Sequence, residues 1–383
     1  MSADRVNVAI VGGGLMGREI AVALQRWPAL IDHPVRPRLT AVCDINPAAL
    51  EWFEAIDTVV TRTTDYRELL GDDSIDVVYV AVRHDLHAQI YADVIRAGKS
   101  LLAEKPFGID AGAARSVLDA MAEHPDSFVR CSSEMPFFPG AQWAIDYIRS
   151  GALGTIVDAR NSFLHSSDLD VLKPINWKRQ ARYCGEAGVL NDLGLHTWHV
   201  PLRLGWAPES VYAVLQNIVP ERPGPGGSPV PCDTWDNAVL HSWVRQDGER
   251  FPLTTETKRI APGQKNTWAL EAVGLEGGVR FSTKNPKLVE VFGVRSIPGI
   301  GSEQTWQQVD VGSQSVWPTV TGGIFESGFS DAILQMWAAF LAEREGALGE
   351  RFGAARPDEA ALTHDIFRAA LRSHESGCAV DVA

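Results

Sequence analysis

The sequence has few cysteines and no long apolar run. Its 383 residues include five widely spaced cysteines and no C-x-x-C pair. We therefore expect neither a disulfide framework nor a metal site, and we expect a reducing, cytoplasmic compartment. The apolar runs, such as residues 77–82, are too short to cross a membrane. The opening MSADRVNVAIVGGG does not show the basic and then apolar pattern of an export signal.

Basic charge is also scarce. Lys and Arg number 35 against 48 Asp and Glu, which gives a net charge of −13. This charge repels a polyphosphate backbone, so the composition argues against nucleic acid as a partner. A content of 45% hydrophobic and 22% charged residues is typical of globular proteins, and the chain is too long for one core. We expect two domains.

The order of apolar and amphipathic segments predicts the architecture of both domains. Residues 6–130 alternate short β-branched runs with helix-like stretches, which is typical of a doubly wound parallel sheet. After about residue 150 the pattern changes to alternating strands rich in Trp, Thr and Val, which predicts a mostly antiparallel sheet. The fold class is thus α/β, with a dinucleotide-binding domain over 1–150 and a substrate-binding domain over 151–383. The last helices, expected at 331–345 and 358–373, should pack back on the rest.

One segment of the second domain is expected to lack regular structure. Residues 220–231 hold five prolines and three glycines, so a surface loop is predicted there.

A glycine-rich turn follows the first predicted strand. Gly12, Gly14 and Gly17 form G-x-G-x-x-G, with Leu15 and Met16 opening a helix. Glycines at this spacing allow a tight turn and close approach of the backbone to a pyrophosphate. Asp44 ends the next long strand, where a carboxylate can accept hydrogen bonds from ribose hydroxyls and repels a 2′-phosphate. The sequence therefore predicts NAD as the cofactor, rather than NADP.

Two further strand ends carry polar residues that are candidates for cofactor binding. Arg83, His84 and His87 follow one strand, and Glu104 and Lys105 follow the next. Ligands bind beyond the carboxyl ends of strands in such sheets. Lysine is rare in this part of the chain, so a lysine fixed at a strand end indicates function more than a plain salt bridge.

The second domain contributes a possible acid–base pair. Asp192 and His196 are four residues apart, so a helix would put both side chains on one face. A carboxylate beside an imidazole suits proton transfer. His199 lies three residues after His196 and could mimic a second metal ligand, but no third ligand with suitable spacing is apparent.

The order of these motifs resembles the Gfo/Idh/MocA oxidoreductases. The residues are GxGxxG, the acid Asp44, the EKP of Glu104 and Lys105, and the D-x-G-x-H that begins at Asp192. The resemblance implies a Rossmann domain joined to an α/β domain with a large open sheet that often forms oligomers. It implies catalytic roles for Lys105, Asp192 and His196, a nicotinamide cofactor, sugar or cyclitol substrates, and a cis peptide bond before Pro106.

Two positions depart from the family pattern and leave the reaction open. Arg83 and His84 replace the usual Pro and Asn, and His199 replaces an Asp. The first interpretation is an NAD-dependent sugar dehydrogenase. The second is a redox-neutral glycosidase, which oxidises C3 transiently and uses extra proton carriers for elimination and water addition. The third is an NAD-sensing protein, which the intact catalytic residues argue against.

The substrate could be anionic. Lys173, Lys178, Arg179 and Arg182 precede the Asp192 motif, and Lys258 and Arg259 end a strand in the same domain. Such a cluster could bind a carboxylate, phosphate or sulfonate, for example on a glucuronide or a sulfoquinovoside, but a solvated basic loop is an equal alternative. Trp177 is a candidate for stacking on a sugar, and His199 is a further substrate-binding candidate.

Overall fold

The computed structural model describes residues 4–312, 315–320 and 326–382, which form two compact units. The first unit holds residues up to Glu134 together with 315–320 and 329–361, and the second unit holds the others. The chain thus enters the second unit after Glu134, before the change in sequence pattern near residue 150, and a C-terminal stretch returns to the first unit.

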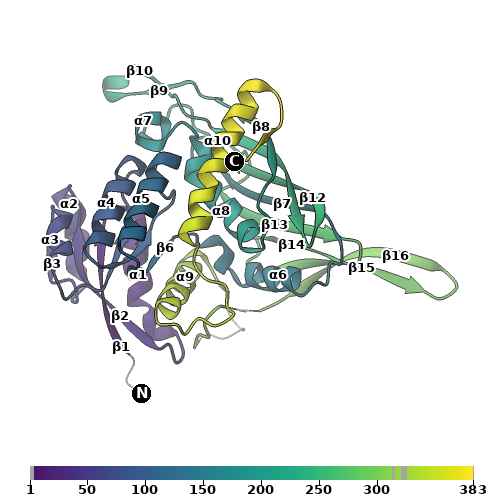
Figure 1. The fold of residues 1–383 in the computed structure, drawn as a ribbon, viewed down its shortest axis with the longest axis horizontal. Coiled ribbons are helices and arrows are strands. Elements are labelled where there is room, and N and C mark those ends of the chain that lie inside the picture. Colours follow the sequence, from purple (N-terminus) through teal and green to yellow (C-terminus); the bar gives the residue numbers. More distant parts are fainter. Residues whose placement is uncertain (1–3, 313–314, 321–325, 383) are drawn as a thin grey trace. The chain divides into compact units, whose positions relative to one another are not determined.

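The first unit is built on a parallel sheet (Figure 1). Its strands run in the order β3-β2-β1-β4-β5-β6, which is the dinucleotide-binding order that the sequence predicted. The four residues of β4 and of β5 are all buried, as expected for strands covered on both faces. Counted over the described residues, the strands are β1 (Asp4–Val11), β2 (Val35–Cys43), β3 (Thr61–Thr63), β4 (Val77–Val80), β5 (Ser100–Ala103) and β6 (Val129–Cys131).

Helices flank this sheet, and one of them comes from the C-terminal stretch. The helix α9 packs against α1, and its residues from Ala332 to Ala342 are buried. A sequence that is apolar on all sides explains this burial. The first unit thus includes a helix from the C-terminal part of the chain. The helices are α1 (Leu15–Gln25), α2 (Pro47–Glu51), α3 (Tyr66–Leu70), α4 (His87–Arg96), α5 (Ala111–Glu123) and α9 (Phe329–Arg344).

The second unit is built on a large open sheet in the order β16-β15-β14-β13-β7-β12-β11-β8-β17. The pair β7 and β12 is parallel and the other neighbours are antiparallel, which confirms the prediction of a mostly antiparallel sheet. In the described part of the chain its strands are β7 (Ile156–His165), β8 (Ser210–Gln216), β11 (Asn237–Gln246), β12 (Glu249–Lys258), β13 (Asn266–Gly274), β14 (Gly278–Ser282), β15 (Leu288–Ile297), β16 (Gly301–Asp310) and β17 (Val380–Asp381).

Helices cover one face of this sheet. The helix α8 (Val189–Arg203) packs on β7, β11 and β12, and α6 (Pro139–Arg149) packs on β13, β14 and β15. The short α7 (Ala181–Cys184) precedes α8, and α10 (Pro357–Ser376) is the last helix. Side chains alternate between the covered and the open face along each strand, so Phe163 is buried while Arg160 is exposed.

The proline-rich segment is a correction to the sequence analysis. It forms a short hairpin of β9 (Glu221–Pro223) and β10 (Pro229–Pro231), with hydrogen bonds from Gly224 N to Ser228 O at 2.7 Å and from Cys232 N to Pro220 O at 2.7 Å. The prolines fit because Pro223 faces Pro229, and the donors of the hairpin come from their neighbours.

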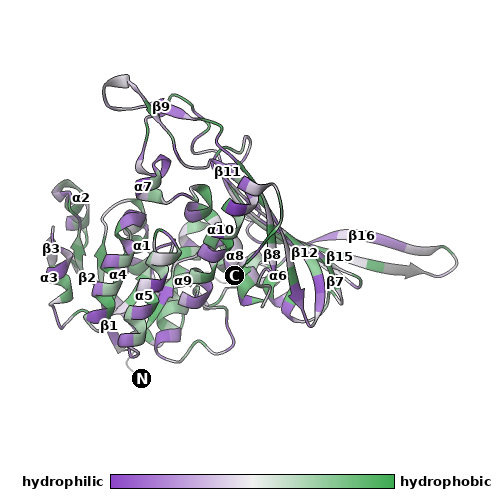
Figure 2. Ribbon diagram, turned by 45° about the horizontal axis from the view of Figure 1, so that its top comes forward, coloured by the Kyte–Doolittle hydropathy of each residue, from purple (hydrophilic) through white to green (hydrophobic). Residues whose placement is uncertain are grey.

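Figure 2 shows how polarity is distributed over the strands. The edge strand β16 is largely hydrophilic, as its sequence GSEQTWQQVD requires. Polar edge strands resist pairing with other chains. Within the described residues, every helix is too short or too polar to span a bilayer.

Candidate active site

The turn after β1 in the first unit brings two stretches of backbone close together. Gly12 has a φ of +107°, and a Cβ at this position would lie 2.2 Å from the carbonyl oxygen of Ala81. A Cβ at Gly17 would lie 2.0 Å from the carbonyl oxygen of Gly12. Both positions therefore require glycine, whereas Gly14 faces open space.

The helix α1 begins at Leu15 with no side-chain cap and no acidic residue in its first turn. Leu15 is 75% exposed and Met16 is half-buried. Backbone N–H groups at such a helix start can bind an anion, because they are unsatisfied and carry a partial positive charge. This end of α1 thus has the chemistry of a phosphate site.

Asp44 follows β2 and is held by backbone amides. Its Oδ2 accepts a hydrogen bond from Gly13 N at 2.8 Å, and its Oδ1 accepts one from Asn46 N at 2.8 Å. The carboxylate is therefore fixed beside the glycine turn. The neighbouring Ile45 is 85% exposed, which leaves an apolar surface next to Asp44.

The segment after β4 carries three of the predicted cofactor-binding residues. Arg83 forms a two-pronged ion pair with Asp85, at 3.1 and 3.0 Å. His84 and His87 are buried, and their rings lie 5.3 Å apart. The His87 nitrogens lie 2.7 Å from Pro106 O and 3.0 Å from Val82 O, so His87 connects the turn after β5 to the turn after β4.

Glu104 and Lys105 follow β5 directly. Glu104 is buried; Tyr79 Oη donates a hydrogen bond to its Oε1 at 2.7 Å and Lys105 N donates one to its Oε2 at 3.2 Å. Lys105 is half-buried. The peptide bond between Lys105 and Pro106 is cis, as the resemblance implied.

A second buried carboxyl follows β6 and was missed in the sequence analysis. Glu134 is 5% exposed. Burial first and the negative charge of Glu104 second raise its pKa to about 7, and the charge of Lys105 opposes this shift. Its signal in the sequence was the polar run Ser132, Ser133, Glu134 at the carboxyl end of a strand.

In the second unit, α8 carries the predicted pair Asp192 and His196. Both residues lie in this helix and are buried, so the spacing of four places them on one face. Trp268 Nε1 donates a hydrogen bond to His196 O at 2.7 Å, and the Phe163 ring meets the His196 ring edge-on. These contacts fix the middle of α8 against the covered face of the sheet.

Two cations hold the carboxylate of Asp192. Lys178 Nζ lies 2.8 Å from Oδ1, and Arg259 donates to Oδ2 from Nη2 at 2.8 Å and from Nε at 3.0 Å. Arg259 also donates to Lys178 O at 3.0 Å, so it ties the two segments together. The side chain of Lys178 is 38% exposed, whereas that of Arg259 is 2% exposed.

Of the two basic residues at the end of β12, Lys258 and Arg259, the structure brings Arg259 to Asp192. Neighbours along a strand point to opposite faces. Lys258 therefore shares a side of β12 with Glu256, with which it pairs, and Arg259 reaches the side that α8 covers. A substrate-binding role for Lys258 has no support in this geometry. The alternation of exposed and buried positions along β12 distinguishes Arg259 from Lys258.

Two other basic candidates belong to a buried ion-pair network. Arg179 is fully buried and pairs with Asp236 and, at 3.4 Å, with Asp168. Lys173 pairs with Asp168 at 3.0 Å. Buried acids thus balance the charge of Arg179, which ties the segment before α8 to the start of β11.

Trp177 and His199 differ in solvent exposure. Trp177 is half-buried, and Lys178 Nζ lies 5.6 Å from the centre of its ring. His199 is fully buried in α8. Trp177 therefore offers exposed surface beside the partly exposed Lys178, whereas His199 does not. Among the residues that the structure describes, no group of acidic, histidine and cysteine side chains could hold a metal ion.

Comparison with protein families matches both units. Residues 6–130 match the model of the GFO/IDH/MocA oxidoreductase family with its NAD-binding Rossmann fold, and residues 142–280 match the GFO/IDH/MocA C-terminal domain. Together the two matches cover more than half of the chain.

Characterised relatives extend over most of the chain. Levoglucosan dehydrogenase of Pseudarthrobacter phenanthrenivorans is 27% identical over 73% of this chain and 74% of its own length. Inositol 2-dehydrogenase of Rhizobium meliloti is 26% identical over 75% of this chain and 78% of its own. A solved structure of levoglucosan dehydrogenase with NADH and levoglucosan superimposes with a TM-score of 0.85 at 24% identity, covering 99% of this chain and all of that one.

The geometry of the first unit fits the dinucleotide of this family. The turn at Gly12 and Gly17 admits no side chain, the start of α1 is uncapped, and Asp44 is fixed beside it. Pyrophosphate would be held by the backbone at the start of α1, and ribose would be held by Asp44.

Proposed function

Since the chain belongs to the GFO/IDH/MocA oxidoreductase family, we propose that it is an NAD-dependent dehydrogenase that acts on a ring hydroxyl of a sugar or cyclitol. The observation that carries this proposal is the combination of Lys105, at the carboxyl end of β5 in the NAD-binding unit, with Asp192 and His196 on one face of α8. The sugar and cyclitol dehydrogenases among the relatives support the substrate class.

Each of the three residues has a role that its surroundings suit. Lys105 would donate a hydrogen bond to the reacting hydroxyl and stabilise the negative charge that develops on its oxygen. His196 would accept the hydroxyl proton. Asp192, fixed by Lys178 and Arg259, would orient the imidazole and stabilise its charged form. Bound NAD would supply the hydride acceptor.

The cations around Asp192 favour an oxygen-rich substrate. Lys178 and Arg259 carry two positive charges against the one negative charge of Asp192. The ammonium of Lys178 has three N–H donors, of which Asp192 takes one, and its side chain is partly exposed beside Trp177. We propose that Lys178 binds a hydroxyl or an acidic group of the sugar, and that Trp177 packs on its ring.

The redox-neutral glycosidase is the second candidate, and the structure lends it less support than the sequence did. That reaction needs additional proton carriers. The histidines considered for this role, His84, His87 and His199, are all buried. We therefore rank dehydrogenation first.

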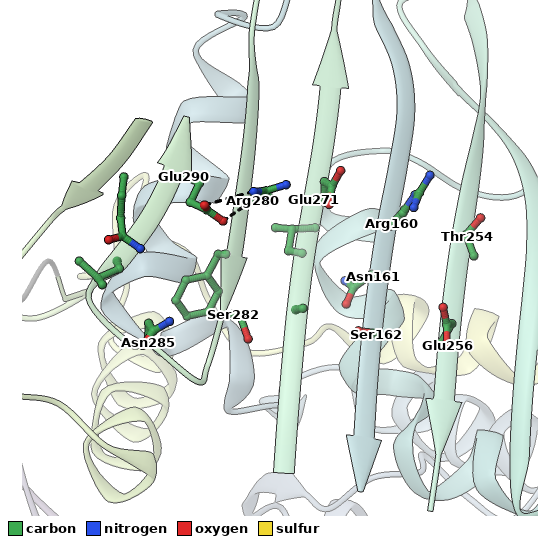
Figure 3. A pocket seen from close by; sticks show the side chains of 15 residues that line it. Arg160, Asn161, Ser162, Thr254, Glu256, Glu271, Arg280, Ser282, Asn285 and Glu290 are labelled. Carbon is green, nitrogen blue, oxygen red and sulfur yellow. Dashed lines mark hydrogen bonds and ion pairs between the residues drawn. The ribbon is translucent and has the colours of Figure 1, made fainter. Parts of the chain in front are cut away.

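We also propose that the open face of the second unit's sheet forms a contact between copies of the chain. A hollow of about 290 Å³ lies on this face. Figure 3 shows the charged residues Glu290, Arg280, Glu271 and Arg160 on neighbouring strands that line it. Glu271 faces Arg160 on one side and Arg280 on the other, and Arg280 pairs with Glu290 at 2.6 Å. Exposed apolar residues share the face, including Val214 on β8 and Trp243 on β11.

The five cysteines form no disulfide, which supports a reducing, cytoplasmic location.

Lys105→Met tests the catalytic assignment. Turnover should fall by about 10² or more, because a group that stabilises developing charge is lost, while NAD binding stays within about threefold. Steady-state kinetics and NAD titration by fluorescence check both quantities. Lys265→Met, at an exposed lysine, is the matched control. Near-native turnover of Lys105→Met would remove Lys105 from the mechanism.

Asp44→Ser tests the cofactor assignment. The wild-type protein should bind NAD more tightly than NADP, since the carboxylate repels the 2′-phosphate. The substitution should narrow that difference by about tenfold or more, which titration of both cofactors measures. Tighter binding of NADP by the wild-type protein would refute the ribose assignment.

A further inference from the structure

The carboxyl ends of β5 and β6 bring two carboxyl groups and a lysine to one edge of the first unit's sheet. The two strands pair in parallel, with Ala103 beside Cys131, and Ser132 N donates to Ala103 O at 2.7 Å. Glu104 and Lys105 follow the first strand, and Glu134 follows the second three residues past its end. Adjacent parallel strands end at the same edge, so these three groups form one cluster.

The surroundings make this cluster sensitive to charge. Glu104 and Glu134 are 6% and 5% exposed. Both oxygens of Glu104 accept hydrogen bonds, from Tyr79 Oη and Lys105 N. Around them lie Tyr79 from β4, Tyr91 from α4 and Cys131 from β6. Burial raises the pKa of each of these three groups well above its ordinary value. The positive charge of Lys105 acts on Glu134 and opposes the effect of Glu104 on it.

We propose that Glu134 is a positioning residue for Lys105. Its carboxylate stabilises the ammonium form of Lys105, and this stabilisation weakens when Glu134 is protonated. Only the O–H bond of the Glu134 carboxyl forms or breaks, and the proton comes from or returns to solvent water. This inference rests on the proposed function, in which the ammonium form of Lys105 stabilises the developing charge. It adds a residue that the roles of Lys105, Asp192 and His196 do not include.

The charge of Glu134 determines its effect on the protonation of Lys105. With both carboxyls ionised, Lys105 faces two negative charges, and loss of its proton is opposed by both. When Glu134 takes up a proton, only Glu104 remains. The pKa of Glu134 is raised to about 7, by burial first and by Glu104 second, so both states are populated near neutral pH. The stabilisation of the Lys105 ammonium by Glu134 thus changes in the pH range in which most enzymes work.

Infrared spectroscopy of the full-length protein tests the protonation of Glu134 without any substrate. The carbonyl stretch of a buried, protonated carboxyl should be present at about pH 6 and lost at about pH 8, and ¹³C labelling of glutamate should shift it. Glu134→Gln should lack the band. Glu123→Gln, at an exposed glutamate, should keep it. Absence of a glutamate band from the wild-type protein at pH 6 would overturn the proposal, and so would its persistence in Glu134→Gln.

The second measurement concerns Lys105 itself. The pH dependence of its reaction with a small acylating reagent, followed by peptide mass spectrometry, reports its pKa. In Glu134→Gln this pKa should fall by about one unit, because one opposite charge is lost. Glu134→Asp, which keeps the charge, should restore most of the wild-type value, and Glu123→Gln should leave it unchanged. An unchanged Lys105 pKa in Glu134→Gln would contradict the proposal. Neither measurement needs turnover, so failure to oxidise a sugar would sink the proposed function and leave this result standing.

Discussion

At the scale of single residues, burial decides the charge of His87. Its side chain is fully buried, and desolvation lowers its pKa from 6.5 to about 4, although carbonyl oxygens of Pro106 and Val82 lie beside its nitrogens. The folded protein therefore keeps His87 neutral in a range where the unfolded chain takes up a proton. Stability must fall as the pH drops through 6.5 towards 4, and the loss is absent above this window.

His87→Gln should make stability less sensitive to acid. Between about pH 7 and about pH 5, the wild-type protein should lose about 2 kcal/mol more free energy of unfolding than the variant does, because linkage at His87 is removed. Urea unfolding at both pH values measures this difference. His241→Gln, at an exposed histidine, should follow the wild-type protein. Parallel pH dependence of His87→Gln and wild type would show that His87 is not buried in its neutral form.

Residue types could be predicted from the sequence more readily than their partners. The glycine turn, Asp44 and Lys105 lie at the strand ends where the pattern placed them. Arg179 was a candidate for substrate binding or for a solvated loop, but it is buried and pairs with Asp236 and Asp168 from distant parts of the chain. Ion pairs between residues far apart in sequence depend on strand register, which one sequence does not reveal.

At the scale of elements, α8 depends on a residue without a side chain. A Cβ at Gly194 would lie 2.3 Å from Cζ of Phe367 on α10, and Phe367 is 2% exposed. The glycine of the D-x-G-x-H motif therefore lets α10 approach the helix that carries Asp192 and His196. The motif thus serves packing as well as chemistry.

Gly194→Ala should lower the free energy of unfolding by about 1–3 kcal/mol, the usual cost of overpacking a core. Chemical unfolding measures it. Phe367→Leu in the same chain should recover part of this loss, so the two substitutions should not be additive. Gly71→Ala, where a Cβ would meet ordinary contacts at 3.7 Å, is the control. Additive effects of the two substitutions would contradict the close contact.

The periodicity of apolar residues predicted most helices and strands, but it did not predict the structure of the proline-rich segment. Its prolines predicted an irregular loop, yet β9 and β10 pair as a hairpin. Composition indicates which residues cannot donate hydrogen bonds, but it does not indicate whether the register needs those donors.

At the scale of the whole molecule, the open sheet face should determine the assembly state. Val214 is 45% exposed on this face in the single chain. Val214→Glu should leave the fold of the chain intact and shift the molecular mass in solution towards that of a monomer, since a charge would be buried in the contact. Light scattering at several concentrations measures the mass. Val60→Glu, at an exposed valine of the first unit, should not change it. A wild-type protein that is monomeric throughout would refute the proposed contact.

The most direct test of the dehydrogenase assignment supplies the protein with NAD and a panel of free sugars, cyclitols and aryl glycosides, both neutral and anionic. NADH absorbance and release of the aglycone are followed separately. The account predicts stoichiometric NADH from at least one free sugar or cyclitol, loss of that signal in Lys105→Met, and intact glycosides. Release of the aglycone without net NADH would contradict it and establish the redox-neutral glycosidase instead.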